Sequence, residues 1–88
     1  MSISAYILIN VEPAATETVV KRLQAIPRAV VREVTGPYDL VMELEGDTVV
    51  DLTWMVRTKI RAIKGVTHTL TCIWIEGPGR QEHAGGQD

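Results

Sequence analysis

Apolar side chains occupy almost every position of residues 3–11, and the run closes shortly before Pro13. A short apolar run that is rich in β-branched residues and followed by proline is typical of a buried strand. Its alternate positions are apolar on both sides, since Ile7 faces one side of the predicted sheet while Tyr6 and Leu8 face the other. We therefore expect a central strand that is covered on both faces.

Residues 14–26 carry apolar side chains every three or four positions, which predicts an amphipathic helix that ends at Pro27. The same spacing predicts a second helix before Gly65, which supplies its stop. Thr48 fits the N-cap of this second helix, with Asp47 as the alternative cap. The inward stripes are Ala15, Val19, Leu23 and Ile26 in the first helix, and Val49, Leu52, Met55, Val56, Ile60 and Ile63 in the second.

Three further strands complete the pattern. Residues 29–35 alternate weakly, residues 40–45 alternate apolar with polar side chains, and residues 66–75 alternate threonines with larger side chains. The segment 36–39 (GPYD) has the composition of a turn, so the first two of these strands are predicted to pair as a hairpin. The order strand, helix, strand, strand, helix, strand predicts an α+β fold of the ferredoxin-like split β-α-β-β-α-β kind. Its four-stranded antiparallel sheet carries both helices on one face, as in dimeric α+β barrels.

The helix-free face of this sheet is predicted to expose apolar residues of the first and last strands. Such a patch favours packing against a second sheet, so we expect a homodimer rather than a monomer. Residues 77–88 are rich in Gly, Gln and charged residues and lack apolar anchors. We therefore expect one domain over residues 1–76 and a flexible tail over residues 77–88.

Composition narrows the function classes. The chain has 88 residues and a net charge of −2, which is one small domain without the positive surface that nucleic-acid binding needs. Its one cysteine, Cys72, has no internal disulfide partner and no metal-ligand spacing around it, and is expected to be a small core or interface residue. No signal peptide or membrane span is evident, so the cytoplasm is the expected compartment, and no metal or cofactor is expected.

The two tryptophans and one histidine have contrasting expected roles. Trp54 falls on the side of the second helix opposite Leu52, so it should face outward, and we expect it to contact a neighbouring subunit. Trp74 lies near the end of the last strand and is expected to pack in the sheet interface. His68 has no metal-ligand partner at a suitable spacing and is expected to be a structural or surface residue.

Three segments together resemble a known family. Residues 6–13 (YILINVEP), 34–40 (VTGPYDL) and 63–71 (IKGVTHTLT) are similar to the effector domain of the Lrp/AsnC transcriptional regulators, and the resemblance covers residues 4–76 in the expected order. Regulators of this family usually carry a helix-turn-helix domain before the effector domain. Because the first strand begins almost at residue 1, the resemblance is to a stand-alone version that lacks the DNA-reading half.

The resemblance also implies a binding site. The family's effector loop corresponds to Gly36, Tyr38 and Asp39, and its Thr-x-Thr pair corresponds to Thr69 and Thr71. Glycine allows backbone N–H groups to approach a ligand carboxylate, while Asp and Thr side chains suit an ammonium group. The alternative is structural: the loop is only a hairpin turn with Asp39 bonded to its own backbone, and the threonines are only good strand formers. Pro37 removes one N–H donor from the loop.

The leading hypothesis is a non-enzymatic domain that senses a small molecule, an amino acid in the first instance, and oligomerises. The resemblance implies sheet-paired dimers that close into an octamer or decamer, with the effector at the dimer–dimer boundary and a full-length Lrp/AsnC regulator as a further partner. One alternative is a small oxygenase or isomerase of the dimeric α+β-barrel kind, with His68 and Asp39 as its available titratable groups. Another is a purely structural ring former without a ligand.

Overall fold

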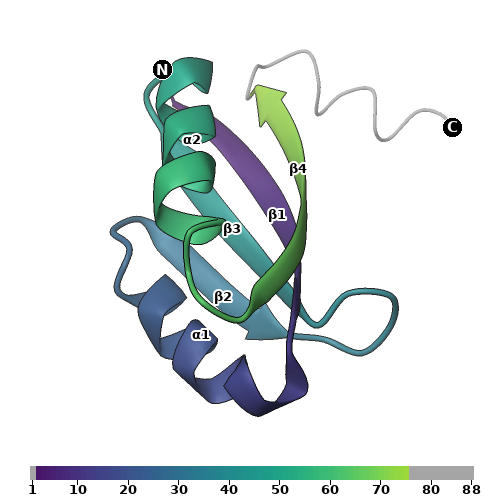
Figure 1. Ribbon diagram of the computed structural model, residues 1–88. Helices are drawn as coiled ribbons and strands as arrows, with labels where there is room; N and C mark the ends of the chain where they lie inside the picture. The colour runs from purple at the N-terminus through teal and green to yellow at the C-terminus, as the bar shows by residue number, and fades with distance from the viewer. Residues whose placement is uncertain (1, 76–88) are drawn as a thin grey trace, which may run out of the picture.

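The computed structural model describes residues 2–75, and all six predicted elements are present in the predicted order (Figure 1). The ferredoxin-like fold expectation is therefore confirmed. The predicted tail lies outside the described residues. The strands are β1 (Ile3–Val11), β2 (Ala29–Glu33), β3 (Leu40–Gly46) and β4 (Val66–Ile75), and the helices are α1 (Thr16–Gln24) and α2 (Val49–Met55), with a 3-10 turn at Pro13–Ala15 and a π-helical turn at Val56–Ile60.

β1 lies in the middle of the sheet, as its apolar pattern predicted. The strand order is β2-β3-β1-β4, and every neighbouring pair is antiparallel. Ile7 of β1 lies opposite Met42 of β3 on one side and Thr71 of β4 on the other. The register shifts between Asn10 and Val11, where β1 approaches its end. β4 is therefore an edge strand that reaches the rest of the molecule mainly through β1.

The core fills the space between the sheet and the two helices, which cover the same face (Figure 1). Alternate residues of β1 and β3 point into it, as period-2 burial requires. Removing these apolar side chains from water is the main force that holds the helices on the sheet. The buried core consists of Ala5, Ile7, Ile9, Val11, Val19, Leu23, Leu40, Met42, Leu44, Leu52, Val56 and Ile60.

The face of the sheet away from the helices keeps several apolar side chains in contact with solvent. Tyr6 of β1 and Leu70 of β4 are 44% and 45% exposed. The rings of Tyr6 and Trp74 lie 4.7 Å apart between centroids, so these aromatics form one cluster on this face. Cys72 lies opposite Tyr6 in the register and is exposed, so of its two expected places the core is wrong and the interface stays a prediction. We call this surface the open sheet face.

α2 begins at the predicted cap and departs from the prediction in its first turn. The Thr48 hydroxyl oxygen accepts a hydrogen bond from the Asp51 N–H at 3.0 Å, which confirms Thr48 as the N-cap. Val49 was expected in the inward stripe but is 43% exposed. Its position in the first turn is the reason, because the sheet strand below α2 has already ended at Gly46.

The ends of the other elements follow from local chemistry. α1 starts later than predicted, at Thr16, because Pro13 opens a 3-10 turn before it. β2 stops at Glu33, two residues short of the predicted end. Gly65 has a φ of 104°, and a Cβ built at this position would lie 2.6 Å from the Ala15 Cβ. Gly65 therefore permits both the turn into β4 and its close approach to the start of α1.

Candidate functional site

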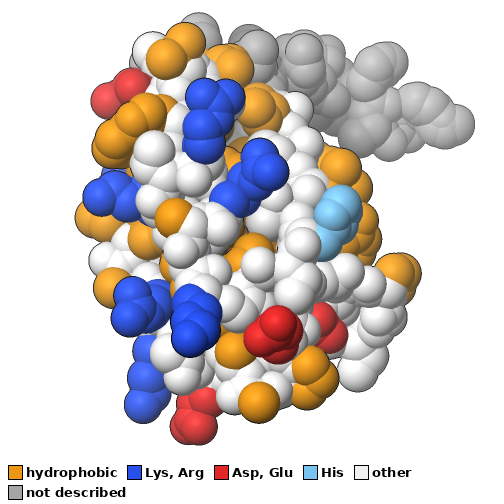
Figure 2. All heavy atoms as spheres, viewed as in Figure 1, with side chains coloured by type: hydrophobic (Ala, Val, Ile, Leu, Met, Phe, Trp, Pro, Cys, Tyr) orange, Lys and Arg blue, Asp and Glu red, His pale blue; other side chains and the backbone are white. Residues whose placement is uncertain are grey.

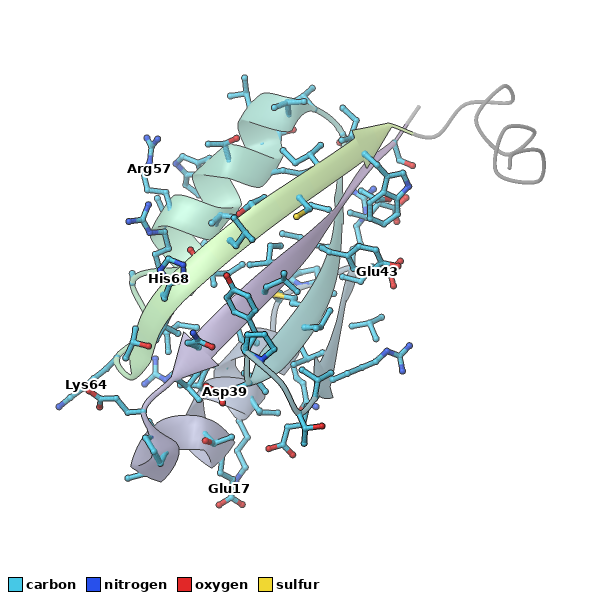
Figure 3. All side chains as sticks on the ribbon, turned by 90° about the vertical axis from the view of Figure 1, so that its right-hand side faces the viewer. Glu17, Asp39, Glu43, Arg57, Lys64 and His68 are labelled. Carbon is cyan, nitrogen blue, oxygen red and sulfur yellow. The ribbon has the colours of Figure 1, made fainter. Side chains whose placement is uncertain are left out.

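Asp39 fastens the β2–β3 loop to the end of β1. Its carboxylate Oδ2 accepts a hydrogen bond from the Val11 N–H at 2.9 Å, and its own N–H donates to the Ile9 carbonyl at 3.0 Å. The Val34 N–H closes the loop by donating to the Asp39 carbonyl at 3.0 Å. Figure 3 shows Asp39 beside the end of β1. The carboxylate thus bonds to the backbone of another strand, and the loop is held at both of its ends.

The tip of this loop needs a glycine for its conformation. Gly36 has a φ of 140°, while no heavy atom lies within 4 Å of a Cβ built at this position. Backbone geometry rather than space therefore favours glycine here. The N–H groups of Gly36 and Tyr38 have no hydrogen-bond partner among residues 2–75, so they remain available to a bound anion. Pro37 between them supplies no donor.

Tyr38 covers a small polar cluster on the open sheet face. Its ring stacks on the ring of His68, with 6.2 Å between centroids and 20° between planes. His68 lies opposite Asn10 in the β1–β4 register. The Asn10 Oδ1 atom is buried without a hydrogen-bond partner in the described part of the chain. A buried oxygen without a hydrogen-bond donor destabilises the folded state, and a ligand could supply that donor. We therefore include Asn10 in the candidate site.

Asn10 was missed as a candidate from the sequence. The sequence did carry a signal, because Asn10 is the one amide side chain in the largely apolar run of residues 3–11. His68 was expected to be a structural or surface residue, and the structure shows it exposed and stacked on Tyr38.

Thr69 and Thr71 lie on the other face of the sheet. They sit opposite Ile9 and Ile7, which point into the core, whereas His68 and Leu70 share the open sheet face with their partners Asn10 and Leu8. Both threonines are half-buried. Within one chain the structure therefore does not bring Tyr38 together with Thr69 and Thr71. Tyr38 belongs to the β2–β3 loop and contacts β4 through His68, whereas the two threonines belong to β4 itself.

A polar hollow runs around the edge of β4. It has a volume of about 310 Å³ and is lined by Arg61, Val66, Thr67, His68 and Thr69. The Thr67 hydroxyl donates to the Asn10 carbonyl at 3.2 Å and so helps to hold the bulged end of β1. The hollow offers Thr69 and the guanidinium of Arg61 together, a combination of donors that suits a carboxylate.

The two tryptophans lie on different surfaces. Trp54 is 54% exposed on the outer side of α2, as predicted, and the ammonium group of Lys59 lies 5.6 Å from its ring centroid. Trp74 is half-buried on the open sheet face beside Tyr6. Their expected roles in contacts between subunits stay predictions.

Two classes of feature are missing from residues 2–75. This part of the chain contains no group of three or more His, Cys, Asp and Glu side chains that would hold a metal ion. It also contains no helix that is both long and apolar enough to cross a bilayer.

Comparison with known proteins identifies relatives of similar size. FFRP-DM1 shares 32% sequence identity with this chain, and the match covers 83% of this chain and 99% of FFRP-DM1 with a TM-score of 0.79. A protein described as hypothetical from Pyrococcus horikoshii is 30% identical, with 92% of this chain and 99% of that chain covered and a TM-score of 0.79. No match was found among curated proteins.

Longer regulators share the fold at lower identity. Escherichia coli AsnC is 19% identical with a TM-score of 0.78, over 86% of this chain and 52% of AsnC. A family model described as the Lrp/AsnC ligand binding domain matches residues 4–81, which is most of the sequence. This chain belongs to the Lrp/AsnC ligand-binding domain family, a family of regulatory, effector-binding domains.

Proposed function

We propose that this domain binds a small zwitterionic effector, an amino acid, and couples its binding to self-association without catalysing a reaction. One observation carries the proposal: Tyr38 and its neighbours lie on one face of the sheet, while Thr69 and Thr71 lie on the other. We therefore place a ligand that contacts both groups at a boundary between two chains, with Tyr38 supplied by one chain and Thr69 and Thr71 by the other. Such a ligand stabilises the assembly by its preference for the assembled state.

The donors and acceptors at the site suit the head group of an amino acid. The free N–H groups of Gly36 and Tyr38 can donate to a carboxylate, and the buried Oδ1 of Asn10 can accept from an ammonium group. Thr69 and Thr71 contribute hydroxyls that both donate and accept. Asp39 has a different task in this proposal, because its bond to the Val11 N–H holds the loop in place.

The open sheet face is the proposed dimer interface. Tyr6, Leu8, Leu70 and Trp74 present apolar and aromatic surface there, and a second sheet would remove this surface from water. Isologous pairing fits a single continuous patch, because the same residues serve on both chains. Octamers or decamers would then arise by further contacts between dimers, with a full-length Lrp/AsnC regulator as a potential partner for the same surfaces.

The experiment combines thermal unfolding with light scattering over the twenty amino acids. Methionine is the first to test, since the fold relative from Neisseria meningitidis is a transcriptional regulator described in complex with L-Met. At a hundredfold excess over its Kd, an effector should add about 2.7 kcal/mol to the free energy of unfolding and increase the assembled fraction. Asn10→Ala should remove the effect, whereas Glu17→Gln on α1 should leave it unchanged.

Two outcomes would contradict the proposal. A stable assembly that ignores every amino acid would favour the purely structural ring former. Turnover of a haem- or flavin-loaded protein, lost in His68→Ala, would favour the small oxygenase or isomerase. The structure gives His68 a stacking partner in Tyr38 and gives Asp39 a backbone donor, so both of these titratable groups already have structural roles.

A further inference from the structure

The outer side of α2 carries apolar residues in the middle of a polar surface. Val50 and Trp54 are 75% and 54% exposed, and their separation of four residues places them on the same side of the helix. Leu52 and Ile60 face the opposite way, into the core, and fix this orientation. An exposed tryptophan next to an exposed valine is the composition of an interface centre rather than of an ordinary helix surface.

Charges are ordered along this helix on either side of Trp54. Asp47 and Asp51 precede it, while Arg57 and Lys59 follow it. Figure 2 shows Lys and Arg side chains gathered over the helix-covered face, and Figure 3 shows Arg57 pointing away from the sheet. Acidic residues near the start of a helix and basic residues near its end also favour the helix dipole. Here the two groups flank an exposed apolar centre, which the dipole does not require.

This order makes the surface complementary to itself. In an antiparallel pair of α2 helices that meet at Trp54, the acidic end of each helix lies beside the basic end of the other. Asp51 lies about 4.5 Å before Trp54 along the axis, from a rise of about 1.5 Å per residue. Lys59 lies in the π-helical turn, and its side chain leans back over the tryptophan, with its Nζ atom 5.6 Å from the ring centroid. In the antiparallel pair, the Asp51 carboxylate of one helix and the Lys59 ammonium group of the other therefore lie at similar heights along the helix axis.

We infer that α2 is a second self-association surface, which pairs antiparallel with α2 of another copy through Trp54 and through reciprocal Asp51–Lys59 contacts. Asp51 makes no ion pair in the described part of the chain, so its carboxylate is available. Asp47 is less so, because it already lies 3.6 Å from Arg28. The contact is isologous, and each copy supplies both charges.

The surface beside Trp54 has room for the partner's side chains. A hollow of about 410 Å³ lies between the end of α1 and α2, with Ile26, Pro27, Met55 and Ile63 among its lining residues. Arg22 and Lys59 also line it. A lining that combines apolar and cationic side chains suits the Val50 and Asp51 side chains of an antiparallel partner.

This contact is independent of the open sheet face and of any effector. The open sheet face and the outer side of α2 lie on opposite surfaces of the domain, so one copy can bind at each of them at the same time (Figure 1). A chain with two different isologous interfaces assembles beyond a dimer. A variant that breaks only one interface should therefore leave smaller assemblies held by the other, and the measured mass shows which interface was lost.

The test exchanges the charges. Asp51→Lys and Lys59→Asp are made separately and their masses measured by light scattering and sedimentation. Each variant alone places like charges opposite one another, so its association through α2 should weaken at least about tenfold. An equimolar mixture of the two variants restores both opposite-charge contacts in a mixed pair, and the double variant restores them in a homotypic pair. Both should recover the assembly.

Controls separate folding from association. Glu17→Lys makes the same charge change on α1 and should leave the mass at the wild-type value. Trp54→Ala should weaken association about thirtyfold or more, while the circular dichroism spectrum stays native. Unchanged masses in both charge variants would overturn the inference, as would a mixture that fails to recover. That second result would indicate a different protein with a complementary helix as the occupant of this surface.

Discussion

The carboxylate of Asp39 and the backbone N–H of Val11 are joined by a hydrogen bond of 2.9 Å across 28 positions of sequence. Val11 is the last residue of β1, and its register with β4 shifts at this point. The bond therefore holds the β2–β3 loop against the end of the central strand. It also explains why an exposed aspartate stands immediately before β3.

Removing this bond should destabilise the domain. Asp39→Ala leaves the Val11 N–H without its partner, and the expected loss is about 1–2 kcal/mol in the free energy of unfolding. Asp39→Asn keeps an oxygen acceptor at the same place and should lose less. Guanidinium unfolding of the two variants measures the difference. Equal stability of Asp39→Ala and the wild type would contradict this assignment.

The two glycines with positive φ should respond differently to alanine. Gly65→Ala combines an unfavourable φ of 104° with a Cβ contact of 2.6 Å to Ala15, and should cost roughly 2–4 kcal/mol. Gly36→Ala meets an unfavourable φ without any close atom, so only the backbone strain of roughly 1–2 kcal/mol applies. Thermal unfolding of the pair provides the comparison. A larger effect at Gly36 would show that the close approach at Gly65 is unimportant.

The stack of Tyr38 on His68 should be visible by NMR. Tyr38→Phe keeps the ring and should preserve the upfield ring-current shift of the His68 side-chain protons. Tyr38→Ala should abolish that shift and lower the free energy of unfolding by about 1 kcal/mol. If both variants give the same His68 spectrum as the wild type, the two rings are not stacked in solution.

A charge on the open sheet face should break the proposed dimer while the fold persists. Leu70→Asp places a carboxylate on a residue that is 45% exposed in the monomer, so folding should change little. Burial of that carboxylate against a second sheet is costly, and the dimer should weaken strongly. Light scattering gives the mass, with Thr18→Asp at an exposed position of α1 as a charge-matched control. Because α2 is a second proposed interface, Leu70→Asp is also combined with Trp54→Ala. A dimer that survives both changes places the sheet interface elsewhere.

The periodic parts of the structure were predictable from the sequence. The apolar run around Ile7 specified a central strand, and alternation from Leu40 to Leu44 specified the buried face of β3. The Thr48 cap was also evident, because its hydrogen bond reaches only three residues ahead. These features depend on local spacing, which a sequence shows directly.

The site depended on relationships that local spacing does not contain. The family resemblance pointed to Asp39, yet its partner Val11 lies 28 positions away and follows only from the strand register. The stacking of Tyr38 on His68 likewise needs both the loop path and the β1–β4 pairing. Val49 was misplaced for a similar reason, because helical periodicity does not reveal where the sheet beneath a helix ends.

The position of β1 also governs when the domain can form during synthesis. Within this domain the first strand to be synthesised pairs with the last, and Ile3 lies opposite Ile75 in the register. Pairing of such distant segments carries a high entropic cost of closure and is slow compared with local structure. Until β4 emerges, one edge of the apolar central strand has no neighbour and can capture a strand from another nascent chain. Completion of the fold is thus a late, nearly all-or-none event, and the order of strands in the sheet makes the interval before β4 emerges the period of greatest exposure to misassembly.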